Sequence, residues 1–302
     1  MSIAYYSRRD QADHLVAIVG LGLIGQAVAE QFKLQAVTCP HNNQYVPDWS
    51  NPQSLIDHLK QTLTSNDAHH LELVWCAGKA GFSSEPAELS RENQFFKKLI
   101  VSLFDDLGDH LRINLISSAG GLYENSGRVT SLDSLSPIRP YANTKLAQEQ
   151  LLHDLDIDHR IYRVSSVYGL GGNRMGLIAV MLQSAINRQP MVIHANQNTL
   201  RDYILNTDIA RTVVDDVLTN AAFGVRILAS GRATSVDMLL NMVHKIIGAR
   251  PVHSFQASGQ NNRDIVFSPR IICCPARVTS LEEGVRLMAK KLLMADRLAN
   301  SA

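Results

Sequence analysis

Short apolar runs alternate with longer amphipathic segments along most of this sequence. The run from Leu15 to Val19 has no polar interruption, which is typical of a parallel strand buried on both faces. The segment from Ser90 to Leu107 instead repeats its apolar residues at helical spacing. This alternation of strands and helices predicts an α/β fold built on a doubly wound parallel sheet. Strands are expected at residues 15–19, 36–38, 71–76, 112–118 and 224–230, and helices at 24–33, 48–64, 90–107, 142–155 and 235–247.

The start of the chain carries little sign of regular structure. Residues 1–13 are polar and are expected to form a loose leader. Arg8 and Arg9, followed by the mostly apolar residues 15–24, imitate a secretory signal, but the glycines within 15–24 and Asp13 before it argue against one. No apolar run approaches the ~20 residues that a membrane-spanning helix needs.

A glycine-rich turn follows the first apolar run. Its sequence is G-x-G-x-x-G, with a predicted strand before it and a predicted helix after it. In that setting the glycines allow a tight turn and the close approach of a pyrophosphate to the helix amino end. The pattern predicts a dinucleotide site rather than a simple glycine-rich turn. Its residues are Gly20, Gly22, Leu23, Ile24 and Gly25.

The end of the second predicted strand departs from the usual NAD site. An Asp or Glu there would hold the ribose hydroxyls and repel a 2′-phosphate. His41, Asn42 and Asn43 occupy this place instead, and none of them is an acid. We therefore expect NADP or NAD as the cofactor, with a slight preference for NADP and with His41 at the binding site. Weak binding at this end is the alternative.

Tyr141 and Lys145 stand four residues apart at the start of a predicted helix, so they share one helical face. A neighbouring ammonium favours the phenolate and would lower the pKa of Tyr141, as a base for proton transfer at a hydroxyl requires. Ser117 and Ser118 end the strand that precedes them. Alone, the Tyr–Lys pair could lie on a solvated helix face, but with the dinucleotide turn upstream a catalytic pair is favoured.

This Ser…Tyr-x-x-x-Lys pattern resembles the short-chain dehydrogenase/reductase superfamily. Later segments resemble its extended branch, the NAD(P)-dependent nucleotide-sugar epimerases and dehydratases. Residues 163–169 (RVSSVYG) are similar to that branch's R-x-S-N-V-Y-G, and residues 201–208 (RDYILNTD) to its R-D-Y-I-x-V-x-D. Residues 275–286 resemble its closing helix start, so the likeness extends from about residue 15 to 293.

The resemblance implies roles for individual residues. Tyr141 would be the acid/base and Lys145 its partner, with Ser118 orienting the substrate oxygen and Ser117 as the fallback. The turn residues Ala77 and Gly78, together with Asn93, Tyr141 and Lys145, would hold the cofactor; an ordinary helix-start amide is the alternative for Asn93. Ser117, Ser166 and Arg201 would contact the substrate, although Ser166 replaces the Asn of relatives. An ion pair of Arg201 with Asp202 or Asp208 is the alternative to a pyrophosphate contact.

The resemblance implies an NAD(P)-dependent oxidoreductase or epimerase that acts on a hydroxyl or keto carbon of a sugar, and we expect that sugar to be nucleotide-linked. Dehydration is disfavoured because Ala119, Gly120 and Gly121 stand where the dehydratases carry Asp-Glu. A regulatory or redox-sensing NAD(P)-binding protein with little turnover is the alternative. Residues 1–170, joined by 203–230, would form the Rossmann domain, and residues 171–202 and 231–302 a smaller, interleaved substrate-binding lobe. The resemblance also implies a homodimer through the helices at 90–107 and 142–155, and each of these segments shows an apolar face wider than one contact requires.

The composition limits the classes of partner molecule that we expect. The chain has 302 residues, 45% of them hydrophobic, and a net charge of +1. Because no block of like charges is present, neither nucleic acid nor a membrane is an expected partner. The four cysteines include no C-x-x-C pair and the 11 histidines show no ligand spacing. A reduced, cytoplasmic protein without a bound metal is therefore expected.

Overall fold

The protein is described by a computed structural model over residues 2–8, 11–35, 48–78, 81–82, 84–172, 175–256, 263–273 and 278–299. Its centre is a six-stranded sheet in the order β1-β2-β3-β4-β6-β10. All neighbouring pairs are parallel except β1 with β2. The strands are β1 (Ile3–Arg8), β2 (Gln11–Val19), β3 (His70–Trp75), β4 (Leu111–Ser118), β6 (Asp158–Val164) and β10 (Gly224–Leu228).

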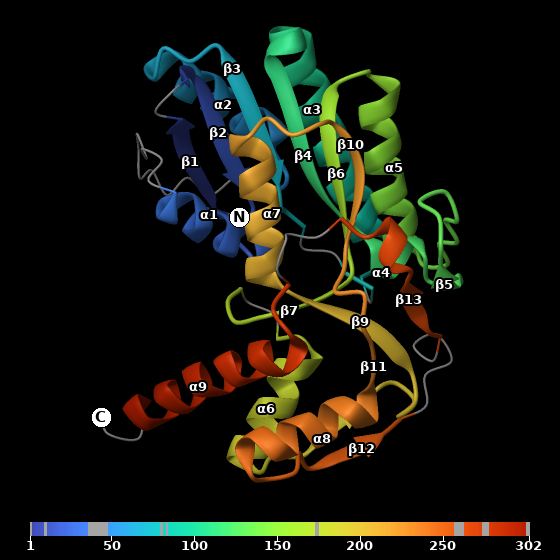
Figure 1. The fold of residues 1–302 in the computed structure, drawn as a ribbon. Helices are drawn as coiled ribbons and strands as arrows, with labels where there is room; N and C mark the ends of the chain where they lie inside the picture. The colour runs from blue at the N-terminus through green and yellow to red at the C-terminus, as the bar shows by residue number, and fades with distance from the viewer. Residues whose placement is uncertain are drawn as a thin grey trace.

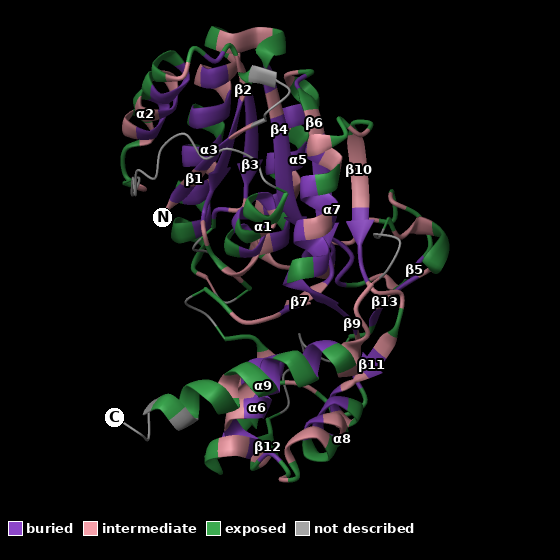
Figure 2. Cartoon of the chain, turned by 60° about the vertical axis from the view of Figure 1, so that its left-hand side comes forward, coloured by how far each residue is buried: buried purple, intermediate pink, exposed green. Residues whose placement is uncertain are grey.

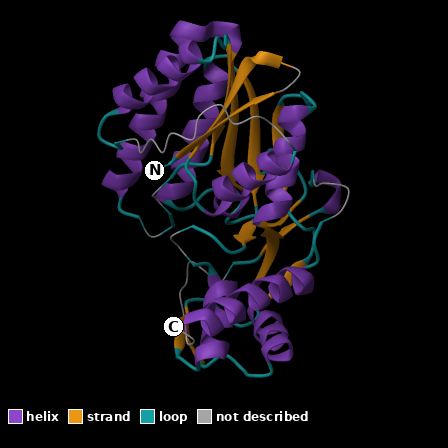
Figure 3. Cartoon of the chain, turned by 90° about the vertical axis from the view of Figure 1, so that its left-hand side faces the viewer, coloured by secondary structure: helices purple, strands orange, loops and turns teal. Residues whose placement is uncertain are grey.

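Helices cover both faces of this sheet (Figures 1 and 3). α1 (Leu23–Leu34) and α7 (Asn206–Leu218) pack on one face, and α2 (Pro52–Ser65), α3 (Pro86–Leu107) and α5 (Pro140–Asp154) pack on the other. The inner strands β3, β4 and β6 are buried along most of their length, whereas the edge strand β10 is only partly buried (Figure 2). This is the doubly wound Rossmann arrangement that the uninterrupted apolar runs predicted. No described helix has both the length and the apolar character to cross a membrane.

The expectation of a loose leader at residues 1–13 is wrong. β1 and β2 form a hairpin in which Tyr6 and Val16 are register partners. Tyr6 is fully buried, stacks on Phe32 at 5.1 Å and donates a hydrogen bond to the Ala29 carbonyl at 2.8 Å. The segment counts as polar in sequence because its tyrosines carry hydroxyl groups. In the fold these tyrosines bury their rings while the hydroxyl can still form a hydrogen bond. β1 therefore lies beside β2 at the sheet edge; the predicted strand at 36–38 and His41 lie outside the described residues.

A second lobe lies beyond the carboxyl ends of the strands (Figure 1). It contains α6 (Leu177–Asn187), α8 (Val236–Ile247), α9 (Leu281–Ala299), β8 (Met191–Ile193) and β12 (His253–Phe255) around a hydrophobic core of its own. The chain enters this lobe after β7 (Ser166–Tyr168), returns to the sheet through α7 and β10, and leaves again at β11 (Ala233–Ser235). The expected interleaving is therefore present, while the division of cofactor and substrate binding between the lobes stays a prediction.

A small sheet joins the two lobes. It has the order β11-β9-β13-β5, and β7 also pairs with β9. β9 (Leu200–Leu205) brings the RDYIL segment to the space between the lobes, and β13 (Ile265–Phe267) and β5 (Gly127–Val129) complete the sheet.

The apolar face of α3 is used within the chain. Phe95, Phe96, Leu99 and Ile100 are buried in the core beneath the sheet. The outward face instead presents polar side chains that include Gln94, Lys97 and Lys98 (Figure 2). The described surface of this helix therefore has no additional apolar face of the kind on which the homodimer expectation partly rested.

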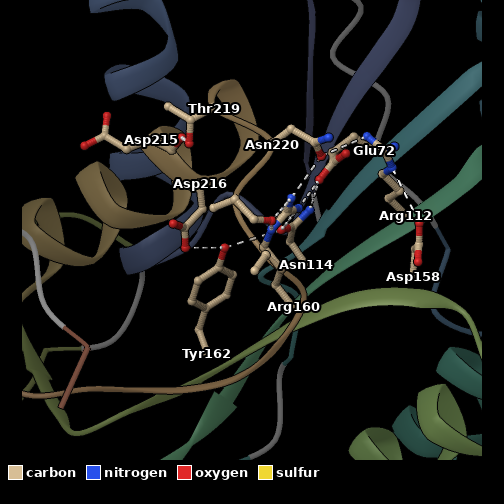
Figure 4. Close-up of polar contacts among 12 residues, drawn as sticks. Glu72, Arg112, Asn114, Asp158, Arg160, Tyr162, Asp215, Asp216, Thr219 and Asn220 are labelled. Carbon is tan, nitrogen blue, oxygen red and sulfur yellow. Dashed lines mark hydrogen bonds and ion pairs between the residues drawn. The ribbon is translucent and has the colours of Figure 1, made fainter. Parts of the chain in front are cut away.

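A buried polar network crosses β3, β4 and β6 on the face covered by α7 (Figure 4). Glu72 accepts hydrogen bonds from Asn114 Nδ2 at 2.6 Å and from Arg160 Nη1 at 2.9 Å. Arg160 also donates to the Ala221 carbonyl beyond α7 at 2.7 Å. Because all three side chains are buried, this ion pair ties the strands together in a single register.

Candidate active site

The carboxyl ends of the parallel strands open into a cavity of about 670 Å³. Ligands of open α/β sheets bind at this edge because the loops there diverge. One side of the cavity is formed by the ends of β3, β4 and β6 and the start of α5, and the other by β8 and β9. Among the residues expected at the site it brings together Ile24, Ala77, Gly78, Ser117, Ser118, Tyr141, Lys145, Ser166 and Arg201. Of the other described candidates, Gly20, Gly22, Leu23, Gly25 and Asn93 do not line it.

The two serines at the end of β4 face different partners. Ser118 caps the short helix α4 (Ala119–Leu122), accepting a hydrogen bond from the Gly121 amide at 3.1 Å, and its hydroxyl also hydrogen-bonds to Tyr141. Ser117 donates to Glu149 at 2.5 Å, and Glu149 forms an ion pair with Arg163 at 2.6 Å. Only Ser118 therefore stands beside the phenol of Tyr141, while Ser117 belongs to a buried structural contact.

Tyr141 and Lys145 lie in the first two turns of α5, as their spacing predicted. Burial, followed by the charge of Glu92, raises the pKa of Tyr141 to about 12, and the hydrogen bond with Ser118 only partly opposes this rise. The expectation that Lys145 would lower this pKa is wrong for the described arrangement. Lys145 donates to Gln148 Oε1 at 3.1 Å and points its ammonium toward the Ile116 carbonyl at 3.4 Å.

The pKa of Lys145 is lowered in its turn. Burial is the main cause, and the negative charges of Glu92 and Glu149 oppose it by favouring the ammonium form. Glu92 thus acts in the same direction on both members of the pair, because a negative charge raises the pKa of acids and bases alike.

Glu92 is the residue that sequence reasoning missed. It lies on α3, is only 5% exposed and lines the cavity, whereas the neighbouring Asn93 does not. A signal was available: Glu92 falls three residues after Leu89 and four before Phe96, both buried, so its carboxylate stands on the apolar face of the helix. A carboxylate at such a position is unfavourable unless it has partners or a function.

Cys76 follows β3 directly and lies near Lys145. Burial raises the pKa of its thiol to about 12, although the charge of Lys145 opposes the rise. The thiol is therefore protonated at neutral pH and is a poor nucleophile.

The glycine-rich turn is built as its sequence predicted. Gly20 has a φ of 95°, and a Cβ there would lie 2.4 Å from Ala77 Cα, so only glycine fits at this crossing. A Cβ at Gly22 would have no atom within 4 Å, which leaves space beside the amino end of α1. Backbone amides and the helix dipole favour a phosphate in such a position.

The residues present fit a dinucleotide cofactor on these grounds. Ile24, Ala77 and Gly78 connect the turn with the cavity that holds Tyr141 and Lys145. The loop after β7 borders the same space, since a Cβ at Gly172 would lie 2.8 Å from the Leu23 nitrogen. The loop after β7 thus packs directly against the amino end of α1.

The second lobe supplies a cation to the cavity. Arg201, on β9, donates a hydrogen bond to the Leu200 carbonyl at 3.0 Å and another to the Arg263 carbonyl, and burial lowers its pKa. Ser166, at the start of β7, lines the same space. Asp202 and Asp208, the acids considered as ion-pair partners of Arg201, have other partners. Asp202 accepts from Ser165 Oγ at 2.9 Å and Ser230 N at 2.7 Å, and Asp208 pairs with Arg211.

Sequence comparison identifies the family. The sequence profile described as the NAD dependent epimerase/dehydratase family matches residues 16–225, a span that contains the glycine-rich turn, Ser118, Tyr141, Lys145 and Arg201. The chain belongs to this family.

Individual relatives agree with the family. A protein of Methanocaldococcus jannaschii, provisionally named a UDP-glucose 4-epimerase, is 25% identical over 148 residues, which cover 46% of this chain and 48% of that protein. The match thus spans only about half the length of this relative.

Two solved structures show the same fold. MoeE5 in complex with UDP-glucose and NAD superposes with a TM-score of 0.79 at 20% identity, covering 94% of this chain and 99% of that one. The UDP-glucose 4-epimerase of Thermus thermophilus in complex with NAD superposes with a TM-score of 0.74 at 17% identity, covering 91% and 97%.

Proposed function

We propose that this protein is an NAD(P)-dependent enzyme that acts on a hydroxyl or keto carbon of a nucleotide-linked sugar, as an epimerase or a ketoreductase. The observation that carries the proposal is the convergence of Ser118, Tyr141 and Lys145 in one cavity beside the glycine-rich turn. These are the groups that move a proton at a carbon–oxygen bond while a dinucleotide is held alongside.

Tyr141 is the proton donor and acceptor in this mechanism. With its pKa at about 12, the neutral phenol predominates near pH 7, which is the form that protonates a keto oxygen. In the opposite direction the phenolate form of Tyr141 accepts the proton of the sugar hydroxyl, and the hydrogen bond with Ser118 favours that form by lowering the pKa of Tyr141. Ser118 orients the same oxygen through its hydroxyl.

The bound dinucleotide would supply hydride acceptance and return, chemistry that belongs to the cofactor. Gly20, Gly22, Leu23, Ile24 and Gly25 would hold its pyrophosphate, and Ala77, Gly78, Tyr141 and Lys145 the part that enters the cavity. The cofactor is NAD or NADP: both solved relatives above are named as NAD complexes, while the absence of an acid near His41 favours NADP. Asn93, which does not line the cavity, would act only indirectly.

Arg201 and Ser166 are the proposed substrate contacts. A guanidinium suits a diphosphate because it is permanently charged and donates in two parallel directions. Arg201 lies across the cavity from Ala77 and Gly78, on the wall formed by the second lobe, so the nucleotide end of the substrate would lie against that lobe. The two solved relatives are, by name, one bound to UDP-glucose and one a UDP-glucose 4-epimerase, which favours a uridine diphosphate sugar.

Dehydration is not proposed, because Ala119, Gly120 and Gly121 offer no acid at the end of β4. Redox sensing through Cys76 is also disfavoured, since its thiol remains protonated. We retain a cytoplasmic location, because Cys76 and Cys273 are both free thiols.

The deciding experiment incubates the purified protein with UDP-, GDP- and dTDP-linked hexoses and with each dinucleotide. An epimerase will interconvert two nucleotide sugars without net change in absorbance at 340 nm, whereas a ketoreductase will consume NADH or NADPH with a 4-keto substrate. Tight dinucleotide binding without turnover of any sugar would instead support the regulatory alternative.

A further inference from the structure

The three strands that carry the candidate active site at their carboxyl ends carry histidines at their amino ends. His14 lies in β2, His70 is the first residue of β3 and His110 immediately precedes β4. His14 and His70 are register partners, and so are Leu71 and Leu111, which places the three histidines side by side on neighbouring strands. Residues 14, 70 and 110 are far apart in sequence, which is why their spacing gave no sign of a cluster.

The three imidazole rings touch in a row. The ring centroids of His14 and His70 are 4.3 Å apart, as are those of His70 and His110. Nδ1 of His110 lies 3.2 Å from Nε2 of His70. The carboxylate of Asp13 lies 4.0 Å from Nε2 of both His14 and His70, and the ligand atoms of these three residues all lie within 4.8 Å of one another.

We propose that Asp13, His14, His70 and His110 together bind one divalent transition-metal ion, with Zn²⁺ as the best match. Three imidazole nitrogens and one carboxylate oxygen form a four-coordinate set that suits Zn²⁺ and does not suit Mg²⁺ or Ca²⁺, which prefer oxygen ligands. Bonds of ~2.0–2.1 Å in a tetrahedral site place ligand atoms about 3.3 Å apart. The His70–His110 separation already has this value, and the ligand atoms of Asp13, His14 and His70, which lie within 4.8 Å of one another, would need to close by up to about 1.5 Å.

The side chains have the freedom to make that adjustment. The Asp13 side chain is 51% exposed and the His70 side chain 28% exposed, and His110 is exposed at the end of the strand. The nearest competing cation is Arg112, but its guanidinium is directed elsewhere, toward Asp158 at 3.9 Å and Asn220 at 3.2 Å (Figure 4).

A metal at this position would be structural. All four coordination positions would be filled by protein groups, so no position would remain open for a substrate. The ion would join the amino ends of β2, β3 and β4, at the opposite end of the sheet from Tyr141 and Lys145. It would therefore stabilise the fold by binding the native state alone, and turnover would change little.

The test is a calorimetric titration of the chelator-treated, full-length protein with ZnCl₂, followed by thermal unfolding with and without the metal. We expect one saturable site per chain and a rise in Tm on Zn²⁺ addition, with no response to MgCl₂. Loss of an outer-shell partner typically weakens metal sites ~10–100-fold, so loss of a direct ligand in His70→Asn or His110→Gln should weaken binding at least about tenfold.

A matched control separates this site from general binding by surface histidines. His153 and His159 form another ring pair, with centroids 4.5 Å apart, so His153→Asn should leave both the affinity and the Tm shift unchanged. His110→Gln guards against misfolding, because His110 is exposed. The absence of saturable Zn²⁺ binding, binding unaffected by both ligand variants, or equal loss in the His153 variant would overturn the proposal.

Discussion

The carboxylate of Glu92 lies so close to Gly78 that a Cβ added at residue 78 would be 3.0 Å from Glu92 Oε1. The missing side chain at Gly78 is therefore what lets a buried acid reach the cavity that contains Tyr141 and Lys145. Burial is the main cause of the pKa shifts of Tyr141 and Lys145, and the charge of Glu92 acts upward on both pKa values, so it moves the pH range in which the pair exchanges a proton.

Glu92→Gln should lower the pKa of Tyr141, since the substitution removes a negative charge that raises it. When Tyr141 accepts a proton from a sugar hydroxyl, the rate rises with pH up to that pKa. The rising limb of kcat/KM should consequently move to lower pH in the variant. Profiles between pH 7 and 10 measure this, with the exposed Glu88→Gln on the same helix as the control. Coincident limbs for the wild type and Glu92→Gln would remove Glu92 from the proton chemistry.

Tyr141→Phe should reduce turnover by ~10²- to 10⁴-fold, the usual contribution of acid/base catalysis. The ring and its 5.0 Å contact with Phe82 are kept, so only the hydroxyl is lost. Dinucleotide affinity, measured by fluorescence titration, should remain near that of the wild type. Turnover within a few-fold of the wild type would mean that another group transfers the proton.

Ser118→Ala and Ser117→Ala should separate the two serines. Ser118 hydrogen-bonds to Tyr141, so its loss should lower kcat, while the loss of Ser117 removes a hydrogen bond to Glu149 and should lower stability instead. A buried hydrogen bond to a charged group contributes roughly 1.5–3 kcal/mol. Turnover and denaturant unfolding of both variants test this, and a kcat defect confined to Ser117→Ala would reverse the assignment.

The preference for NADPH or NADH should depend on the residues that come after the second predicted strand. Without an acid there, NADPH should bind as tightly as NADH, or up to about tenfold more tightly at pH 7, if a modest charge-assisted contact of roughly 1.5–3 kcal/mol is only partly formed. His41→Asp should reverse the preference by repelling the 2′-phosphate. Fluorescence titrations with both dinucleotides decide the matter. NADH tighter by more than tenfold in the wild type would show that an acid elsewhere holds the ribose.

Arg160→Met should lower the free energy of unfolding by about 3–5 kcal/mol, because it leaves Glu72 buried without its partner. The double variant with Glu72→Gln should recover part of that loss. Arg112→Met is the matched control: its ion pair with Asp158 is longer, at 3.9 Å, and partly exposed, so it should cost about 1 kcal/mol or less. Equal losses for the two single variants would mean that the buried network contributes no more to the free energy of unfolding than the partly exposed ion pair.

The homodimer expected from the family resemblance remains a prediction for light scattering at micromolar concentration. If α3 forms the interface, its exposed Lys97 and Lys98 must lie at the contact, and Lys98→Glu should change the dimer dissociation constant. A monomeric wild-type protein would end this prediction.

Much of the half of the fold that is expected to bind the cofactor could be predicted from the sequence, because the signals are local. Gly25 is required by backbone geometry over a few residues, because a Cβ there would lie 2.2 Å from the Gly20 oxygen. The uninterrupted apolar strands likewise encode burial on both faces. The start of the last helix is equally local: Ser280 followed by Glu283 has the spacing of a capping box, and the Ser280 hydroxyl accepts the Glu283 amide hydrogen at 3.2 Å.

The errors arose where long-range packing decides. Residues 3–8 pair with β2 although their own pattern is weak, because a strand edge and two buried tyrosines stabilise what local preference does not. Asn93 matched a motif, but the rotation of α3 against the sheet turns Glu92 toward the cavity. The row of three histidines likewise forms only because three strands that are distant in sequence pair side by side in the sheet.

The sequence by itself therefore determined the fold class, the glycine-rich turn and the pairing of Tyr141 with Lys145 on one helical face. Only the tertiary structure decided which serine meets the phenol, which helix residue enters the cavity and in which direction the pKa of Tyr141 moves. The physical reason is that spacing along a chain fixes relations within one helix or turn. Burial and charge at a site are instead sums over neighbours from many elements, and those neighbours are known only once the chain has packed.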